Sequence, residues 1–218
     1  QDLWVPAEAD VVIEGYAIPG ETRTEGPFGD HFGIYSLPGE YPVMHVTAIT
    51  HRSDPVIPMT IVGLPPMEDG FIGEAISSAF LPVLRFQHRD VVDLHVPLET
   101  GFHNLAIIAS KQRYPRQARK TCLGLLGAGQ MMFTKVAIAV DAEHPVRSMG
   151  NLLDTIHARV DPAEDLVVLK GMVADTLESA APWENVHDKL LIDATTLAAA
   201  DPRLGGLELP RGTGIKET

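Results

Sequence analysis

The sequence predicts a mixed α and β protein, with a β-rich first part followed by a small α/β domain. Residues 10–62 contain short runs of β-branched residues separated by Gly and Pro, which is typical of strands in a barrel or sandwich. Residues 91–171 instead alternate strand-like apolar runs with helical patterns, which is typical of an α/β domain. The length of 218 residues is compatible with one large domain or two small ones.

The first part contains four candidate strands separated by turn residues. The first run should stop at Pro19-Gly20, because both residues favour turns. The run PVMHVTAIT alternates with period two, as a half-buried strand does. In the last run, Pro58 favours an edge or a bulge, because proline lacks the amide hydrogen. The four runs are residues 10–18, 31–37, 42–50 and 55–63.

Residues 70–88 change to a helical period and predict a linker helix. Pro82 lies inside this stretch and should kink the helix or break one of its hydrogen bonds. The apolar residues recur at steps of three and four and form one stripe: Phe71, Ile72, Ala75, Ile76, Ala79, Phe80, Val83 and Leu84.

The α/β domain should begin near residue 91. Pro115 is placed for the first turn of the first helix, and Ser148 can cap the second. Residues 172–218 have little periodicity, so they predict an ordered but irregular tail of a kind that can wrap a partner. The expected strands are residues 91–97, 105–110, 135–141 and 165–171, and the expected helices are residues 114–127 and 148–160.

Charge and cysteine content exclude several classes of protein. With 17 Lys and Arg against 29 Asp and Glu, the net charge of −12 argues against nucleic acid or an anionic membrane as the partner. The one cysteine, Cys122, cannot form an internal disulfide, which favours a reducing compartment and predicts a cytoplasmic location. No apolar run is long enough to span a membrane. The start QDLWVPAEAD is not a signal peptide, and we expect a trimmed chain.

Two carboxylates flank a turn in the segment EGPFGD. Glu25 and Asp30 are separated by two glycines and a proline, which fix an unusual backbone path. Such a turn can direct both acids into one cavity, where mutual repulsion keeps one of them protonated near neutral pH. The alternative is an exposed turn with two solvated acids, since Asp and Glu are usually exposed.

The segment TEGPFGDHFGIYS resembles a signature of the UbiD-like decarboxylases, which are carboxy-lyases that depend on prenylated FMN. Further segments resemble the same family in the same order along nearly the whole chain. These segments are VVIEGYAIPGETRTEGPFGDHFGIYS, IVGLPPMEDGFIGEA, VDLHVPLETGFHNLAIIASKQRYPRQARK, GAGQMMFTKVAIAVD and KLLIDATT.

The resemblance implies reversible decarboxylation of an aromatic or α,β-unsaturated carboxylic acid, with the modified flavin as electron sink. It assigns Asp30 as the acid that protonates the carbon from which CO₂ leaves. Glu25 then belongs to a Glu-Arg-acid network with Asp30 and helps to set its charge state. The closest-looking motifs belong to the quinone-pathway branch, so an aromatic quinone precursor is the expected substrate.

The resemblance also implies a domain organisation. Residues 1–70 should form part of a split β-barrel of the flavin-reductase kind, residues 71–90 a linker helix, and residues 91–218 the C-terminal α/β domain with its tail. The family's arginine, its Mn²⁺ ligands and most contacts to the flavin phosphate lie upstream of the matched stretch. We therefore expect prenylated FMN, Mn²⁺ and K⁺ with most of their ligands outside this chain, and we do not assign the family's arginine to Arg23.

Weaker site assignments follow from the same resemblance. Thr60 and Met132 are placed near the flavin, and His31 and Met131 near the substrate. Met131 and Met132 would form a flexible apolar wall, although core packing explains them equally well. His31 could instead pack within its loop. The spacings HxH and HExxH are absent, so no metal site is expected on this chain.

Two other functions remain open. The chain could be a non-catalytic fragment with a role in assembly, or an ordinary FMN-binding split-barrel reductase. The reductase is disfavoured because the matching motifs continue through the α/β domain. The expected partners are a small carboxylic acid and either a second copy of the chain or the upstream portion of the same precursor.

Overall fold

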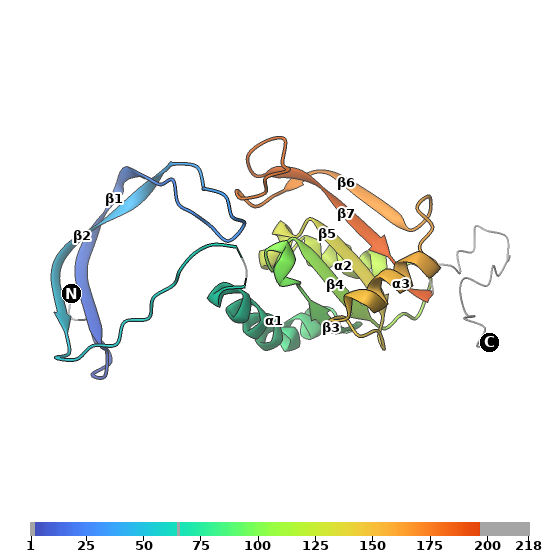
Figure 1. Cartoon of the computed structure of the whole chain (residues 1–218), viewed down its shortest axis with the longest axis horizontal. Coiled ribbons are helices and arrows are strands. Elements are labelled where there is room, and N and C mark those ends of the chain that lie inside the picture. The colour runs from blue at the N-terminus through green and yellow to red at the C-terminus, as the bar shows by residue number, and fades with distance from the viewer. Residues whose placement is uncertain (1–2, 65, 197–218) are drawn as a thin grey trace. The chain divides into compact units, whose positions relative to one another are not determined.

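The computed structural model describes residues 3–64 and 66–196, and it divides the chain into two compact units, Gln1–Leu64 and Pro65–Thr218 (Figure 1). Each unit contains one sheet, so the prediction of a mixed α and β protein is confirmed. No helix among the described residues has the length and apolar character needed to cross a membrane.

The first unit is built on a long antiparallel ribbon of two strands, β1 (Val11–Glu25) and β2 (Gly39–His51). The prediction that β1 stops at Pro19-Gly20 is wrong. The strand continues to Glu25 across a register shift between Ala17 and Thr22, and Gly20 there adopts a positive φ of 84° that favours glycine. The turn residues therefore mark a bulge within β1.

Residues 31–37 and 55–63 do not form the predicted strands. The first segment contributes only an isolated bridge between Gly29 and Tyr35, and the second has no strand pairing in the described part of the chain. Pro55 and Pro58 each remove a backbone donor that a strand would use. With two strands described and no closed barrel, the split barrel stays a prediction.

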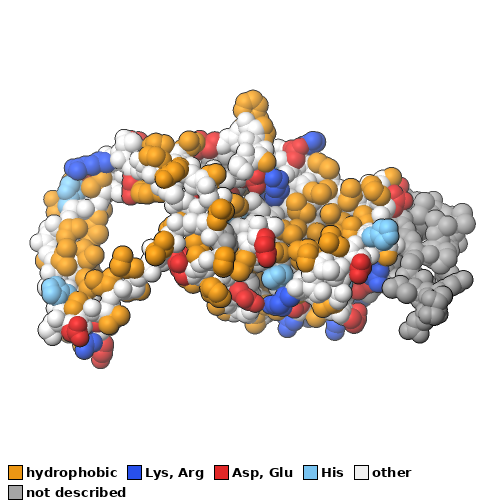
Figure 2. Space-filling model, in the orientation of Figure 1, with side chains coloured by type: hydrophobic (Ala, Val, Ile, Leu, Met, Phe, Trp, Pro, Cys, Tyr) orange, Lys and Arg blue, Asp and Glu red, His pale blue; other side chains and the backbone are white. Residues whose placement is uncertain are grey.

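The ribbon exposes apolar side chains along its length, as Figure 2 shows for one face. A two-stranded ribbon is only marginally stable alone, because it cannot bury enough apolar surface. The exposed residues on β1 and β2 include Ile13, Tyr16, Ile18, Tyr41, Met44, Val46 and Ile49.

The second unit begins with helix α1 (Glu68–Gln87), which contains Pro82 as predicted. Near its start, the side of α1 that faces Leu98 has no room for a side chain: a Cβ on Gly70 would lie 2.5 Å from Leu98 Cδ2. Leu81 and Leu84 continue this face onto the core. Most of the predicted apolar stripe points outward instead and is exposed: Phe71, Ile72, Ile76, Phe80 and Val83.

The second unit contains a five-stranded sheet in the order β3-β4-β5-β7-β6. The strands β4, β5 and β7 run parallel, and β3 and β6 pair antiparallel at the two edges. The bounds are β3 (Val91–His95), β4 (Leu105–Ser110), β5 (Val136–Asp141), β6 (Leu166–Val173) and β7 (Val186–Asp193).

Helices cover both faces of this sheet. Alternate residues of β4 and β5 pack against α1 and α2 (Gln117–Leu126) on one face and against α3 (Met149–Arg159) on the other. Short 3₁₀ helices, η1 (Leu98–Thr100) and η2 (Gly129–Phe133), precede β4 and β5. This layering explains why β4 and β5 are apolar on both sides.

The starts of α2 and α3 can be compared with the predicted positions of Pro115 and Ser148. Ser148 caps α3 as predicted, accepting a hydrogen bond from the Asn151 amide at 3.4 Å. Pro115 lies outside α2, because the helix begins only after Arg116.

The prediction of an irregular region after residue 172 is wrong for Val186–Asp193, which form the interior strand β7. The part of the predicted tail after residue 196 lies outside the described residues.

Candidate functional site

The acid-bearing loop follows directly from the end of β1. Gly26 has a φ of 96°, a conformation that residues with a side chain rarely adopt, and the chain turns there before the Gly26-Pro27 bond. Backbone hydrogen bonds then close the loop: the Asp30 amide donates to Ile34 O at 3.0 Å, and the Gly33 amide donates to Asp30 O at 2.9 Å. Asp30 is therefore held by its own loop.

The carboxylate of Asp30 is oriented by the next residue. Its Oδ1 accepts hydrogen bonds from the His31 amide at 2.7 Å and pairs with His31 Nδ1 at 2.8 Å. His31 is 9% exposed, whereas the Asp30 side chain is 33% exposed. Within residues 3–64 and 66–196 no hydrogen bond to Asp30 Oδ2 is present, so this oxygen is available to a reacting group.

Glu25 and Asp30 are not joined by any described contact. Glu25 ends β1 opposite Gly39 and is exposed, while the described partner of Asp30 is His31. Arg23 pairs with Glu21 at 3.8 Å and is exposed. The structure thus places the predicted acid beside a histidine, and the proposed role of Glu25 remains a prediction.

The remaining predicted residues lie on different units. Thr60 is exposed and lies in a stretch of the first unit that is neither helix nor strand. Met131 and Met132 lie on η2 of the second unit, where Met131 packs against the core and Met132 is 37% exposed. Met131 therefore fits the core-packing alternative, while Met132 presents part of its side chain at the surface.

A buried lysine, which the sequence did not predict as a site residue, binds the backbone of η2 and the residue after it. Lys189 on β7 is 1% exposed, and its Nζ donates to Met132 O at 2.6 Å and to Thr134 O at 2.7 Å. Burial lowers the pKa of Lys189 to about 8. The signal available in the sequence was the Lys of KLLIDATT, whose alternation with Leu191 places it on a buried face.

The lowered pKa of Lys189 predicts a stability that rises with pH. Between pH 8 and about 10.4, the unfolded chain binds more protons than the folded chain at this residue, so folding becomes more favourable as pH increases. We expect wild type to gain about 3 kcal/mol relative to Lys189→Met across this interval. Urea unfolding of both proteins at several pH values measures this difference, in which the titration of other groups cancels. A difference that is constant with pH would contradict the assignment.

A second polar cluster lies, like η2, at the end of the sheet where the parallel strands begin. Glu178 is buried and accepts hydrogen bonds from Asn104 Nδ2 and Lys135 Nζ, each at 2.9 Å. Burial acts to raise the pKa of Glu178, but the hydrogen bonds from Lys135 and the Ala180 amide outweigh it and the pKa lies below its usual value. This cluster fixes the loop before β7 to the starts of β4 and β5.

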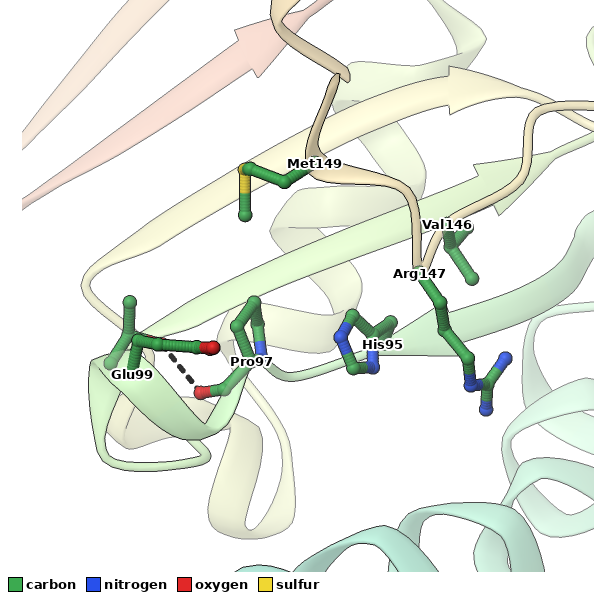
Figure 3. Close-up of a pocket in the computed structure, with 7 residues that line it drawn as sticks. His95, Pro97, Glu99, Val146, Arg147 and Met149 are labelled. Atoms are coloured by element: carbon green, nitrogen blue, oxygen red, sulfur yellow. Dashed lines mark hydrogen bonds between the residues drawn. The ribbon is translucent and has the colours of Figure 1, made fainter. Parts of the chain in front are cut away.

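A pocket of about 360 Å³ lies on the second unit, between the end of β3 and the turn before α3 (Figure 3). Arg147 on its rim pairs with Asp93 at 3.2 Å and with Glu74 at 3.6 Å. Burial and then the charge of Arg147 lower the pKa of His95. No predicted site residue lines this pocket, whose walls are His95, Pro97, Glu99, Thr100, Val146, Arg147 and Met149.

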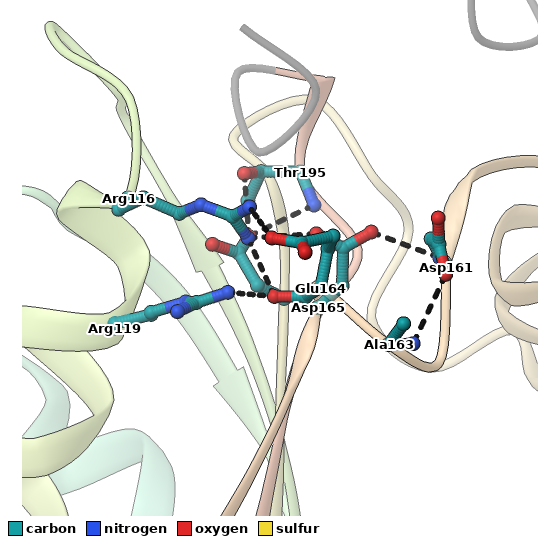
Figure 4. A network of polar contacts seen from close by, with 8 residues as sticks. Arg116, Arg119, Asp161, Ala163, Glu164, Asp165 and Thr195 are labelled. Carbon is teal, nitrogen blue, oxygen red and sulfur yellow. Dashed lines mark hydrogen bonds and ion pairs between the residues drawn. The ribbon is translucent and has the colours of Figure 1, made fainter. Parts of the chain in front are cut away.

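An ion-pair network lies at the opposite end of the sheet, where the parallel strands finish (Figure 4). Arg116 Nη1 donates to Asp165 Oδ1 at 2.7 Å and to Glu164 O at 2.9 Å, and Asp165 is fully buried. Asp165 Oδ2 in turn accepts from the Asp161 amide at 2.9 Å. These bonds join Arg116, which precedes α2, to the residues directly before β6.

The described residues around Asp30 can be compared with what a flavin or a metal ion would need. No group of three or more potential metal-ligating side chains occurs in the described stretches. The partly exposed carboxyl group of Asp30, with one oxygen bound by His31, can act as an acid or a base. A flavin phosphate needs cationic or amide donors, and the hydrogen bonds described for this loop do not include such a set.

Comparison with known proteins covers both units. Residues 1–65 match the model of the 3-octaprenyl-4-hydroxybenzoate carboxy-lyase Rift-related domain, and residues 70–194 match the C-terminal domain of the same family. An uncharacterized protein of Archaeoglobus fulgidus is 46% identical over 194 residues, and one of Aquifex aeolicus is 44% identical over 196 residues. Each comparison covers 89% of this chain and 40% of the relative, so the chain spans less than half the length of these relatives.

Two solved structures are similar over most of the chain. Vanillic acid decarboxylase of Sedimentibacter hydroxybenzoicus in its closed form aligns with a TM-score of 0.84 and 28% identity, over 93% of this chain and 43% of that chain. The UbiD-class enzyme HmfF of Pelotomaculum thermopropionicum, in complex with FMN, aligns with a TM-score of 0.73 and 26% identity, over 88% of this chain and 42% of that chain. With both family models matched across the two units, the chain belongs to the UbiD family of carboxy-lyases.

Proposed function

We propose that this chain supplies the proton-donating loop and part of the substrate wall of a reversible, non-oxidative decarboxylase that uses prenylated FMN. The observation that carries the proposal is Asp30, which His31 holds through Oδ1 while Oδ2 accepts no hydrogen bond within the described residues. Family membership supports carboxy-lyase chemistry, and a relative of similar structure is a vanillic acid decarboxylase.

The proposed chemistry gives Asp30 a defined task. When CO₂ leaves an aromatic or unsaturated acid, the bonding electron pair stays on the carbon, and a bound prenylated flavin would supply the electron sink for it. A proton from Asp30 Oδ2 then forms the new C–H bond, and the resulting carboxylate regains a proton from solvent, to which one third of the side chain is open. His31 keeps the carboxyl group oriented during this transfer.

The substrate class follows from chemistry and family together. A small aromatic acid suits an apolar wall that includes Met132, since the thioether side chain adapts to flat rings. The description of the matched family, a 3-octaprenyl-4-hydroxybenzoate carboxy-lyase, supports a 4-hydroxybenzoate as the first acid to test, and the vanillic acid decarboxylase supports smaller phenolic acids.

We also propose that residues outside these 218 complete the flavin site, the Mn²⁺ site and the K⁺ site. The relatives are more than twice as long as the matched region, and the β1–β2 ribbon lacks cover for its apolar side chains. Assembly into an oligomer would similarly cover the outward face of α1. Under the alternative function, the chain is an assembly piece without cofactor.

The test is decarboxylation by the complete protein that contains this chain, loaded with prenylated FMN. A panel of hydroxybenzoic, vanillic and acrylic acids is incubated with it, and CO₂ release and product are measured. We expect cofactor-dependent release from at least one aromatic acid. A loaded protein that releases no CO₂ from any acid of the panel would overturn the proposed function and favour the assembly alternative.

A further inference from the structure

Lys189 is the one side chain described here whose charged end holds η2 from inside the second unit. It lies on β7, and both of its described acceptors are main-chain carbonyls at the end of η2, Met132 O at 2.6 Å and Thr134 O at 2.7 Å. These carbonyls belong to the segment that leads from the exposed Met132 into β5. One buried ammonium group therefore ties the wall segment to the middle of the sheet.

Core packing alone does not require a lysine at this position. Along β7 the buried face carries Lys189 and then Leu191, and Leu191 belongs to the apolar core beneath α2. An apolar side chain of similar length would fill the same space without placing an ammonium group away from water. A buried lysine is unusual. Because the described partners of Lys189 are main-chain carbonyl oxygens, its bonds hold the backbone of residues 132–134 in place.

The short helix η2 has few backbone hydrogen bonds of its own to fix its position. The segment is a single 3₁₀ helix, which has poorer hydrogen-bond geometry than an α-helix and is stable only in short pieces. Its own backbone bonds include that of the Thr134 amide to Met131 O at 3.1 Å. The two bonds from Lys189 add an attachment to another element, so they restrict how far Met131 and Met132 can move.

We propose that Lys189 is a positioning residue: by binding the carbonyls of Met132 and Thr134 it fixes the η2 wall that the proposed decarboxylase uses to orient its substrate. The inference rests on the proposed function for its catalytic consequence. The structural part of the inference, that Lys189 fixes the position of η2, is independent of the proposed function.

The test compares Lys189→Met with Lys170→Met in the complete protein. Methionine nearly matches lysine in length but cannot donate to the carbonyls. Lys170 offers the same substitution on the neighbouring strand β6, where the side chain is exposed and pairs with Asp188 at 2.6 Å. Methyl-labelled methionine reports on η2 directly through the resonances of Met131 and Met132.

We expect Lys189→Met to shift or broaden the Met131 and Met132 methyl resonances, whereas Lys170→Met leaves them unchanged. In the loaded enzyme, Lys189→Met should raise KM for the accepted aromatic acid several-fold and lower kcat by less, since the acid on Asp30 is untouched. Methyl resonances identical to wild type would overturn the proposal, and so would altered resonances with an unaltered KM.

Two precautions keep the outcome readable. If Lys189→Met does not fold, Lys189→Gln retains an uncharged amide donor on a shorter side chain, and we expect it to give intermediate methyl shifts under the same criteria. If the loaded wild type shows no decarboxylation, the proposed function fails, and with it the KM readout. The methyl resonances still decide whether Lys189 holds η2, so the two failures are distinguishable.

Discussion

Replacing Asp30 by Asn should reduce decarboxylation by about 10²–10⁴-fold, the contribution usual for a positioned general acid. Asparagine has nearly the same shape, and its side-chain oxygen can still accept from the His31 amide, so the loop should keep its conformation. What it lacks is a carboxylic proton at the position of Oδ2. The measurement is kcat for product formation by the complete protein loaded with prenylated FMN.

The control for this prediction is Asp54→Asn, the same substitution at an exposed aspartate of the same unit. It should leave turnover and flavin content near wild type. Asp30→Asn should also retain its flavin, as read from the visible absorbance of the purified protein. Undiminished turnover in Asp30→Asn would refute the role of Asp30 as the acid.

The second large effect is on stability and comes from Arg116. Replacing Arg116 by Met leaves the fully buried Asp165 without the guanidinium that now binds it at 2.7 Å. Breaking a buried ion pair from one side typically costs about 3–5 kcal/mol, because the remaining charge stays buried. We expect a loss of this size in the free energy of unfolding of the second unit, measured by urea denaturation.

A matched surface variant separates this effect from loss of any cation. Lys170→Met removes an exposed pair with Asp188 and should cost less than about 1 kcal/mol. The double variant Arg116→Met/Asp165→Leu removes both members of this ion pair and should recover part of the lost stability. A single variant Arg116→Met as stable as Lys170→Met would show that the network does not stabilise the fold.

The strands that could be predicted are those whose buried faces are apolar. The runs LAIIAS and VAIAVD are apolar on both faces because helices cover both sides of β4 and β5. The strand β7 was missed because its buried face carries His187, Lys189 and Asp193. Their polarity hid an interior strand in what resembled a tail.

Errors in the first unit have a different cause. A β-branched run predicts that a segment can be extended, but a strand also needs a neighbour with free backbone groups. Among the described residues, 31–37 pair only through the isolated bridge of Tyr35 to Gly29, and 55–63 pair with no strand. By contrast, β1 has β2 along its length and therefore continues through Pro19-Gly20 as a bulge. Pairing, which is not local, decided these outcomes.

The sequence predicted some of the residues of the candidate site, but not the contacts that these residues make. The EGPFGD segment and its glycine turn directed attention to Asp30, but the partner that orients it, His31, could not be distinguished from a packing residue by sequence. Lys189 was not predicted, because lysines are usually exposed and nothing local indicates that its amine binds carbonyls of a segment far away in the chain.

The most direct test of the proposed reaction is the isotope content of the product formed in D₂O. The complete protein, loaded with prenylated FMN, is given an aromatic acid from the panel, and the product is analysed by mass spectrometry and NMR. We predict one deuterium at the carbon that lost CO₂, with no product when the flavin is omitted. An oxygenated product, or turnover that continues without the flavin, would contradict a non-oxidative decarboxylation in which Asp30 delivers a solvent-derived proton.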